Sequence, residues 1–259
     1  ATTKSGKQKA GNLIDEYNLG YNGEKFLGND GLVLYLPFDG DMKDKSGNNI
    51  NATNVGADLV NGKLGGAYDF NGLSFGGDYA ILPDDSRLDF TGELTVSSWI
   101  YAKAAPGQYG INCVNNPVGG TLERTTILSK YDYNAGAERG WNLGPDWCGN
   151  YLSFHINNNS RIQINDPNFF VNKLNRWVLV TGVYKPSSYM RLYEDGVLVV
   201  QIVNPSVPNA IVYSSSSDPV RIGVRAINGQ SHFNGTLDEV RIYNRSLSSE
   251  EVYYLYKYG

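Results

Sequence analysis

Several residue types that identify common protein classes are scarce in this chain. Its 259 residues include only two cysteines, two methionines and two histidines, and charged residues make up 19% of the total. No apolar run approaches the length of about 20 residues that a membrane-spanning helix needs. The net charge of −4 comes without the basic clusters that bind phosphate backbones or anionic lipids. We therefore predict no nucleic-acid partner and no membrane span within this chain.

The two cysteines, Cys113 and Cys148, lie in a stretch rich in Gly, Asn and Pro. They are either two unrelated buried thiols or a disulfide, which would restrict the unfolded chain by roughly 3–4 kcal/mol. Their position in apparent loops rather than apolar strands favours the disulfide, and with it an oxidising compartment. One cysteine pair cannot form a Cys-rich zinc site, and His155 and His232 do not fall at metal-ligand spacing.

The chain is rich in turn residues, with 30 Gly and 28 Asn, which separate short runs of alternating apolar and polar residues. This alternation predicts strands over 32–38, 94–101 and 177–185, and Asp195-Gly196 between two β-rich runs predicts a hairpin. Further strands are expected near 66–71, 79–82, 126–130, 151–156, 161–164, 220–224 and 236–243. About a dozen strands with almost no helix predict an all-β fold, a two-sheet antiparallel sandwich.

Short helices are predicted at both ends of the chain. Apolar residues on one helical face between 10 and 17 indicate an amphipathic helix, which glycines and an Asn-Asp-Gly turn then end. We assign 1–31 to a helical leader and linker, and 32–259 to the β-domain. Near the C-terminus, Ser248 and Glu251 have the spacing of a capping box that begins a short helix.

The segment 104–150 is the irregular part of the domain. It contains both cysteines, a Gly-Gly pair and a cluster of tyrosines and tryptophans. A long loop in a compact domain is usually functional or disordered, and a disulfide within it favours order.

Several motifs resemble those of concanavalin A-like, laminin G-type jelly rolls. They follow the family order: LVLYLPFDGD at 32–41 with DKSGN at 44–48, GGAYDFNG at 65–72, LTVSSWI at 94–100, Trp177 with the Asp-Gly hairpin at 193–196, and GTLDEVRIYNRSLS at 235–248. The insertion around 104–125 departs from the pattern, and the leader lies outside it. The resemblance implies a jelly-roll sandwich of the kind that mostly serves as a carbohydrate-binding or adhesion module, often with a structural calcium ion.

The same resemblance implies a calcium site at the edge of the sandwich. There Asp39, at the end of the first strand, would meet Asp238, in the last strand, and backbone carbonyls would complete the shell. Calcium accepts six to eight oxygen ligands, so two carboxylates with carbonyls and water suffice chemically. The alternative is that Asp39 and Asp41 form a polar turn while Asp238 pairs with Arg241 or another basic group.

Sugar-binding sites commonly combine an aromatic face with polar side chains that bind hydroxyl groups. Five residues in or beside the long segment could supply such a site: Tyr131, Tyr133, Arg139, Asp146 and Trp147. In the alternative, Trp147 packs on a disulfide at Cys148. Trp99, Trp141 and Trp177 follow strand patterns and are expected in the core.

No catalytic motif is present. The resemblance includes hydrolases with Glu-x-Asp-x-x-Glu on one strand, and this chain lacks that spacing. Glu194 and Asp195 fall at a hairpin turn, and strict alternation would place Asp238 and Glu239 on opposite faces of their strand. Neither histidine accompanies a recognisable nucleophile motif. We therefore do not expect an enzyme.

These observations describe a non-catalytic extracellular binding or adhesion module that recognises glycans or a protein at a cell surface. Four sequons would be possible N-glycosylation sites in a secreted chain: Asn51, Asn158, Asn234 and Asn244. The alternative is a structural subunit of a surface-anchored or pilin-like filament, in which copies of the chain contact one another and the leader continues an apolar segment preceding Ala1. A third hypothesis is a glycosidase with an unrecognised carboxylate arrangement.

Overall fold

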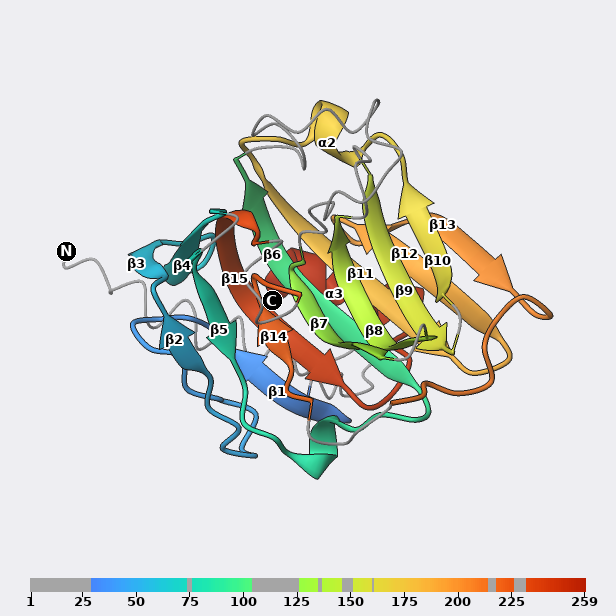
Figure 1. Cartoon of the computed structure of the whole chain (residues 1–259). Coiled ribbons are helices and arrows are strands. Elements are labelled where there is room, and N and C mark those ends of the chain that lie inside the picture. The colour runs from blue at the N-terminus through green and yellow to red at the C-terminus, as the bar shows by residue number, and fades with distance from the viewer. Residues whose placement is uncertain are drawn as a thin grey trace, which may run out of the picture.

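Two antiparallel β-sheets pack face to face in the computed structural model of the chain (Figure 1). The structure describes residues 29–73, 76–103, 126–134, 137–145, 151–159, 161–213, 218–225 and 232–259. The predicted N-terminal helix and the cysteine pair lie outside these ranges. None of the helices within them is both long and apolar enough to cross a membrane.

Sheet A lies behind sheet B in the view of Figure 1. Its strands run in the order β13 (Val197–Val203), β12 (Tyr189–Glu194), β11 (Trp177–Lys185), β6 (Leu94–Ala102), β15 (Asn234–Tyr243), β4 (Gly66–Asn71) and β3 (Asp58–Asn61), with β1 (Leu32–Leu36) also paired to β15. Sheet B contains β10 (Arg161–Asp166), β9 (Leu152–Asn158), β8 (Ala137–Pro145), β7 (Leu128–Asn134), β14 (Arg221–Ile222), β5 (Tyr79–Ile81) and β2 (Thr53–Val55). The predicted jelly-roll sandwich is confirmed.

The strands predicted from alternation are present, with boundaries shifted by a few residues. The predicted hairpin joins β12 to β13, and its turn residues Asp195 (φ 50°) and Gly196 (φ 78°) have the positive φ that such a turn requires. The strands β2 and β3 were not predicted, because every residue in them is exposed and no alternation marks them. Two strands, β7 and β8, lie within the segment 104–150. The first was predicted near 126–130, whereas β8 falls in a stretch that was expected to be irregular.

Alternate residues of facing strands fill the space between the sheets. On β9, Leu152, Phe154 and Ile156 are fully buried, and Ile100 of β6 is buried from the other sheet. The sheets approach closely where Gly182 of β11 faces the ring of Phe154, since a Cβ on Gly182 would lie 2.5 Å from that ring. Burial of apolar surface here is the main source of stability.

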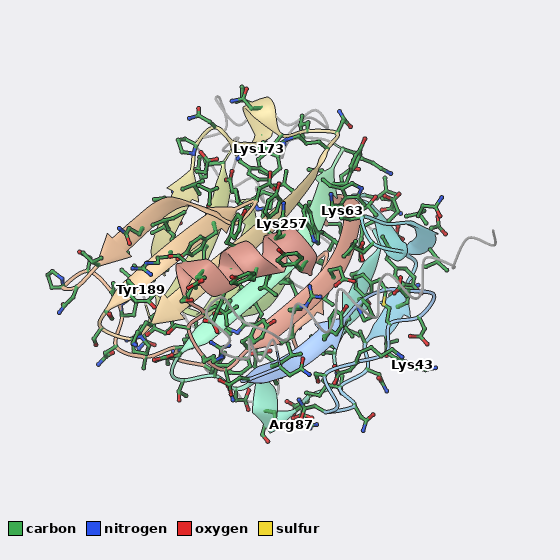
Figure 2. All side chains as sticks on the ribbon, turned by 180° about the vertical axis from the view of Figure 1, so that it is seen from behind. Lys43, Lys63, Arg87, Lys173, Tyr189 and Lys257 are labelled. Atoms are coloured by element: carbon green, nitrogen blue, oxygen red, sulfur yellow. The ribbon has the colours of Figure 1, made fainter. Side chains whose placement is uncertain are left out.

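The outer face of sheet A is covered by the C-terminal helix α3 (Ser249–Tyr258), as Figure 2 shows. Val252 and Leu255 of the helix pack on Trp99 and other outward-facing residues of the sheet. The indole Nε1 of Trp99 donates to the carbonyl oxygen of Gly259 at 3.1 Å. The helix therefore forms a third layer over part of the sandwich.

The predicted capping box begins this helix. The backbone N–H of Glu251 donates to Oγ of Ser248 at 3.2 Å, and Oε2 of Glu251 accepts from the N–H of Ser248 at 2.7 Å. Glu251 also pairs with Arg245 at 2.7 Å. The remaining helices are the short α2 (Phe169–Asn172) and the 3-10 turn η1 (Ser86–Leu88).

A β-bulge interrupts β15 at Glu239, which has a left-handed backbone (φ 53°). Asp238 pairs with Trp99 of β6, whereas Arg241 pairs with Ser97, so two residues of β15 lie opposite one residue of β6. The extra residue shifts the alternation, and Asp238 and Glu239 both point away from the core. The expectation that they lie on opposite faces is therefore wrong, because it assumed a regular strand.

Candidate functional site

The turn between β3 and β4 lies against two carboxylates. Asp39 follows β1, where Phe38 adopts a left-handed conformation (φ 60°) that redirects the chain toward β4. The N–H of Gly66 donates to Oδ1 of Asp39 at 2.7 Å. The N–H of Leu64 donates to Oδ2 of Asp238 at 3.0 Å. The fold thus brings both residues predicted to bind calcium to the same turn.

Two glycines allow the turn to approach these carboxylates closely. A Cβ on Gly62 would lie 2.6 Å from Oδ2 of Asp238 and would overlap the carbonyl oxygen of Gly66. Gly65 has a φ of +66°, and a Cβ there would overlap Oδ1 of Asp39. Larger residues do not fit at either position, so carboxylate and carbonyl oxygens gather around this turn.

Asp238 is a buried carboxylate without a cationic partner among the described residues. Its side chain is 0% exposed, and its Oδ1 accepts no hydrogen bond. Burial is the largest cause that raises the pKa of Asp238, to about 7, and the donated N–H of Leu64 opposes it. Removing a carboxylate from water in this way costs free energy unless a proton or a cation neutralises it.

The oxygens around Asp238 fit a hard cation such as calcium. The unpartnered Oδ1 of Asp238, the carbonyl oxygen of Gly66 and the carboxylate of Asp39 are all oxygen donors, which calcium prefers. Across the described ranges, no group of three or more His, Cys, Asp or Glu side chains gathers in a way that could hold a metal. A calcium ion here would therefore depend on backbone carbonyls and water as well as on the two carboxylates.

Glu239, the next residue, has a different environment. Its Oε2 accepts from the hydroxyl of Tyr35 at 2.8 Å and from the guanidinium of Arg241 at 2.5 Å. That guanidinium also lies 4.2 Å from the ring centroid of Tyr35. Burial raises the pKa of Tyr35, so the phenol stays protonated and donates. Arg241 thus forms its ion pair with Glu239, and the alternative pairing with Asp238 does not form.

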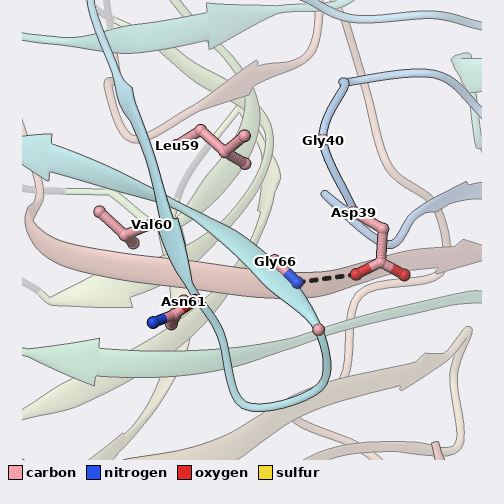
Figure 3. Close-up of a pocket in the computed structure, with 7 residues that line it drawn as sticks. Asp39, Gly40, Leu59, Val60, Asn61 and Gly66 are labelled. Carbon is pink, nitrogen blue, oxygen red and sulfur yellow. Dashed lines mark hydrogen bonds between the residues drawn. The ribbon is translucent and has the colours of Figure 1, made fainter.

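A shallow pocket of about 570 Å³ opens beside this turn (Figure 3). Its walls are Asp39, Gly40, Leu59, Val60, Asn61, Gly65 and Gly66. Leu59 and Val60 belong to β3, the edge strand of sheet A, and are exposed. The pocket offers one carboxylate, Asp39, which already accepts from Gly66. It therefore has the form of an open rim and not that of a catalytic cleft.

The residues predicted to bind glycans are only partly within the described ranges. Tyr131 is 7% exposed, and the guanidinium of Arg225 lies 3.6 Å from its ring centroid. Nε of Arg139 donates to Oδ1 of Asn159 at 3.1 Å. The side chain of Tyr133 and the whole of Asp146, Trp147, Cys113 and Cys148 lie outside what the structure describes. This site and the disulfide stay predictions.

The three tryptophans expected in the core have three different environments. Trp141 is fully buried between the sheets, as expected. Trp99 is buried on the outer face of sheet A, beneath α3. Trp177 is only partly buried, on the same outer face. Sequence reasoning missed this because both faces of β11 are apolar, and alternation alone could not tell which face points outward.

The four sequons also differ in environment. Asn51 and Asn244 are exposed, whereas Asn158 and Asn234 are partly buried. The amide of Asn158 donates to Oδ1 of Asn209 at 3.1 Å, and Oδ1 of Asn51 accepts from the N–H of Asp44. Glycosylation at these positions stays a prediction.

Three solved structures illustrate the similarity of fold. The binding domain of Paraclostridial Mosquitocidal Protein 1 has a TM-score of 0.64 and 21% identity, covering 88% of this chain and 52% of that one. Domain 4 of AbnA, an extracellular GH43 arabinanase from Geobacillus stearothermophilus solved with arabinotriose, has a TM-score of 0.61 and 21% identity, covering 86% and 96%. A structure of botulinum neurotoxin type C, described as dependent on two ganglioside molecules for cell entry, has a TM-score of 0.64 and 19% identity, covering 88% and 51%.

These identities show a shared fold and nothing finer, and this chain spans about half the length of the two toxin chains. No curated protein sequence matches it. A family model does match: the laminin G type described as the concanavalin A-like lectin/glucanases superfamily covers residues 74–253, well over half of the chain. Together with the two-sheet jelly roll, this match shows that the chain belongs to the concanavalin A-like lectin/glucanase superfamily.

Proposed function

We propose that this protein is a non-catalytic, extracellular carbohydrate-binding module. The observation that carries the proposal is the burial of the two adjacent carboxylates at the β15 bulge. Asp238 is 0% and Glu239 is 3% exposed, and Glu239 is held by Tyr35 and Arg241. A glycosidase needs two carboxylates that reach opposite sides of a bound glycosidic bond, and this pair cannot reach one.

Carbohydrate is the preferred ligand class for two reasons. The superfamily description joins lectins with glucanases, and both classes of protein contact sugars. Two proteins of similar fold are also described with sugars, one in complex with arabinotriose and the other with gangliosides. A cell-surface protein is the alternative partner.

A glycan array with the fluorescently labelled chain tests this function. We expect binding to at least one oligosaccharide class and no release of reducing sugar from any bound glycan. An intact fold with no glycan bound would overturn the proposal. Release of reducing sugar by the folded chain would establish a glycosidase instead.

We also propose that the module binds a structural calcium ion at the turn between β3 and β4, with Asp238 and Asp39 as its carboxylate ligands. The support is the combination of a fully buried carboxylate, its unpartnered Oδ1, and glycines that let carbonyl oxygens approach it. Bound there, a divalent cation would supply the positive charge that Asp238 lacks. It would fix the turn without taking part in any reaction.

A further inference from the structure

A row of outward-facing side chains crosses sheet A just beyond the end of α3. The strand registers place these residues side by side, and we call them the aromatic–polar row: Trp177 of β11, Tyr101 of β6, Thr236 of β15 and Asp69 of β4. The neighbouring register row contains Leu179, Trp99 and Asp238. That row is buried, under α3 at Trp99 and under the turn between β3 and β4 at Asp238.

The aromatic end of the row is a pair of partly exposed rings. The centroids of Trp177 and Tyr101 are 5.7 Å apart, and their planes meet at 62°. Neither ring belongs to the core between the sheets, although Trp177 packs along the edge of the cluster beneath α3. Both side chains are partly exposed, and exposed aromatic faces stack on the C–H groups of a sugar ring.

The polar end of the row is held in a fixed geometry. Oδ1 of Asp69 accepts from the hydroxyl of Thr236 at 2.8 Å, and Oδ2 pairs with Nζ of Lys103 at 2.7 Å. The side chains of Asp69 and Lys103 are 23% and 44% exposed, so both remain accessible to a ligand. A carboxylate and an ammonium group oriented before binding lose little entropy when they bond to hydroxyl groups.

Charged side chains of both signs lie beside the aromatic–polar row. Asp58 of β3 lies opposite Asp69, and Lys63 extends over the ring of Trp99 with its Nζ 4.5 Å from the centroid. Figure 2 shows Lys63 on this face, near the helix that carries Lys257. Among the described residues, Asp58, Asp69, Lys63 and Lys103 therefore place both carboxylates and ammonium groups beside the aromatic–polar row. A surface of this composition favours a neutral ligand over a strongly acidic or basic one.

We propose that the aromatic–polar row is the site of a neutral oligosaccharide. A sugar ring stacks on Trp177 and Tyr101, and the hydroxyl groups of the same or the next sugar bond to Asp69 and Lys103. The row spans four neighbouring strands, a width of about 14 Å, which accommodates more than one sugar ring. The proposal rests on the carbohydrate-binding function proposed above and adds its location and ligand class.

Isothermal titration with arabinotriose, cellotetraose and sialyllactose tests the site. We expect the full chain to bind at least one of the two neutral sugars more tightly than sialyllactose. Trp177→Ala should weaken that binding at least tenfold, and Lys103→Met several-fold. Tyr258→Ala removes an exposed aromatic ring of α3 outside the row and should leave affinity unchanged. Thermal melting of each variant shows whether it is folded.

The outcomes separate the site from the function. Binding that persists unchanged in both Trp177→Ala and Lys103→Met would overturn the site while leaving carbohydrate binding in place. Preference for sialyllactose would overturn the neutral ligand class. No binding of these three sugars by the folded full chain would overturn the site, and the glycan array then decides whether the function stands. If Trp177→Ala does not fold, the affinity of Lys103→Met decides whether the site is correct, because that variant changes a side chain that is 44% exposed.

Discussion

At the β15 bulge, the adjacent carboxylates of Asp238 and Glu239 have opposite environments. Glu239 is nearly buried, and the guanidinium of Arg241 and the hydroxyl of Tyr35 both bond to its carboxylate. Asp238 is equally buried, yet its Oδ1 has no partner and its pKa rises to about 7. The carboxylate of Glu239 therefore has its partners within the protein, whereas that of Asp238 can still take up a proton or a cation. Burial alone does not decide the charge of a side chain; the partners that the fold provides do.

Removing the paired carboxylate of Glu239 should have the largest effect on stability. Glu239→Ala leaves the buried guanidinium of Arg241 without this ion pair, so we expect a loss of about 3–5 kcal/mol in the free energy of unfolding. Urea denaturation measures it. Asp41→Ala removes an exposed pair with Lys43 and should cost far less, because solvent screens exposed ion pairs. Similar losses for the two variants would contradict the contrast.

The pH dependence of stability should distinguish Asp238 from its neighbour. The pKa of Asp238 is about 7 in the folded chain and 3.8 in its ordinary state, so between these values the folded chain holds a proton that the unfolded chain has released. That stabilisation is complete below pH 4 and is lost as the pH rises through 7, by at most about 4 kcal/mol.

Urea denaturation at pH 5 and pH 8, with a chelator present, measures this loss. Asp238→Asn resembles the protonated form and should remove most of the difference between the two pH values. Asp58→Asn, a change of an exposed aspartate of β3, is the control. The same slope in wild type and Asp238→Asn would show that Asp238 does not titrate in this range.

Calcium should oppose the same pH trend. At pH 8 an ion present at about 100 times its Kd would stabilise the fold by about 2.7 kcal/mol, and at pH 5 the protonated Asp238 would bind it less well. Melting temperatures with calcium and with chelator measure the shift, which Asp238→Asn should abolish and Asp39→Asn should reduce. Identical melting curves with and without calcium would show that the turn between β3 and β4 binds no calcium.

The smallest effect concerns the turn that covers Asp238. Gly62→Ala would place a methyl group 2.6 Å from Oδ2 of Asp238, and we expect a loss of about 1–3 kcal/mol in stability. Gly92→Ala is the matched control, because a Cβ there meets nothing within 4 Å. Equal melting temperatures for the two variants would show that the turn accommodates the added methyl group without losing stability.

Much of the sandwich could be predicted from local sequence patterns. The strands β6 and β11 follow from alternation, the turn at Asp195-Gly196 from its need for positive φ, and the start of α3 from the capping box at Ser248 and Glu251. The exposed edge strands β2 and β3 lack such a pattern, because they form through pairing with β5 and β4 and not through their own side chains.

The candidate sites were less predictable. Asp39 and Asp238 were identified from a family resemblance, but nothing in the spacing of the residues indicated the bulge at Glu239 or the partners of Arg241. The outward position of Trp177 was also hidden, since a strand with apolar residues on both faces gives no direction. Lys103 follows β6 and Asp69 lies in β4, so their ion pair joins parts of the chain that are distant in the sequence.

The sequence by itself determined most of the strands, the tight hairpin and the helix cap, because each depends on residues within a few positions of one another. Only the tertiary structure decided which outward face α3 covers, which carboxylate is neutralised and which aromatic rings stay exposed. These properties come from contacts between residues far apart in the chain, such as the bond from Leu64 to Asp238 across 174 positions. Local patterns carry no information about such contacts until the two sheets have packed.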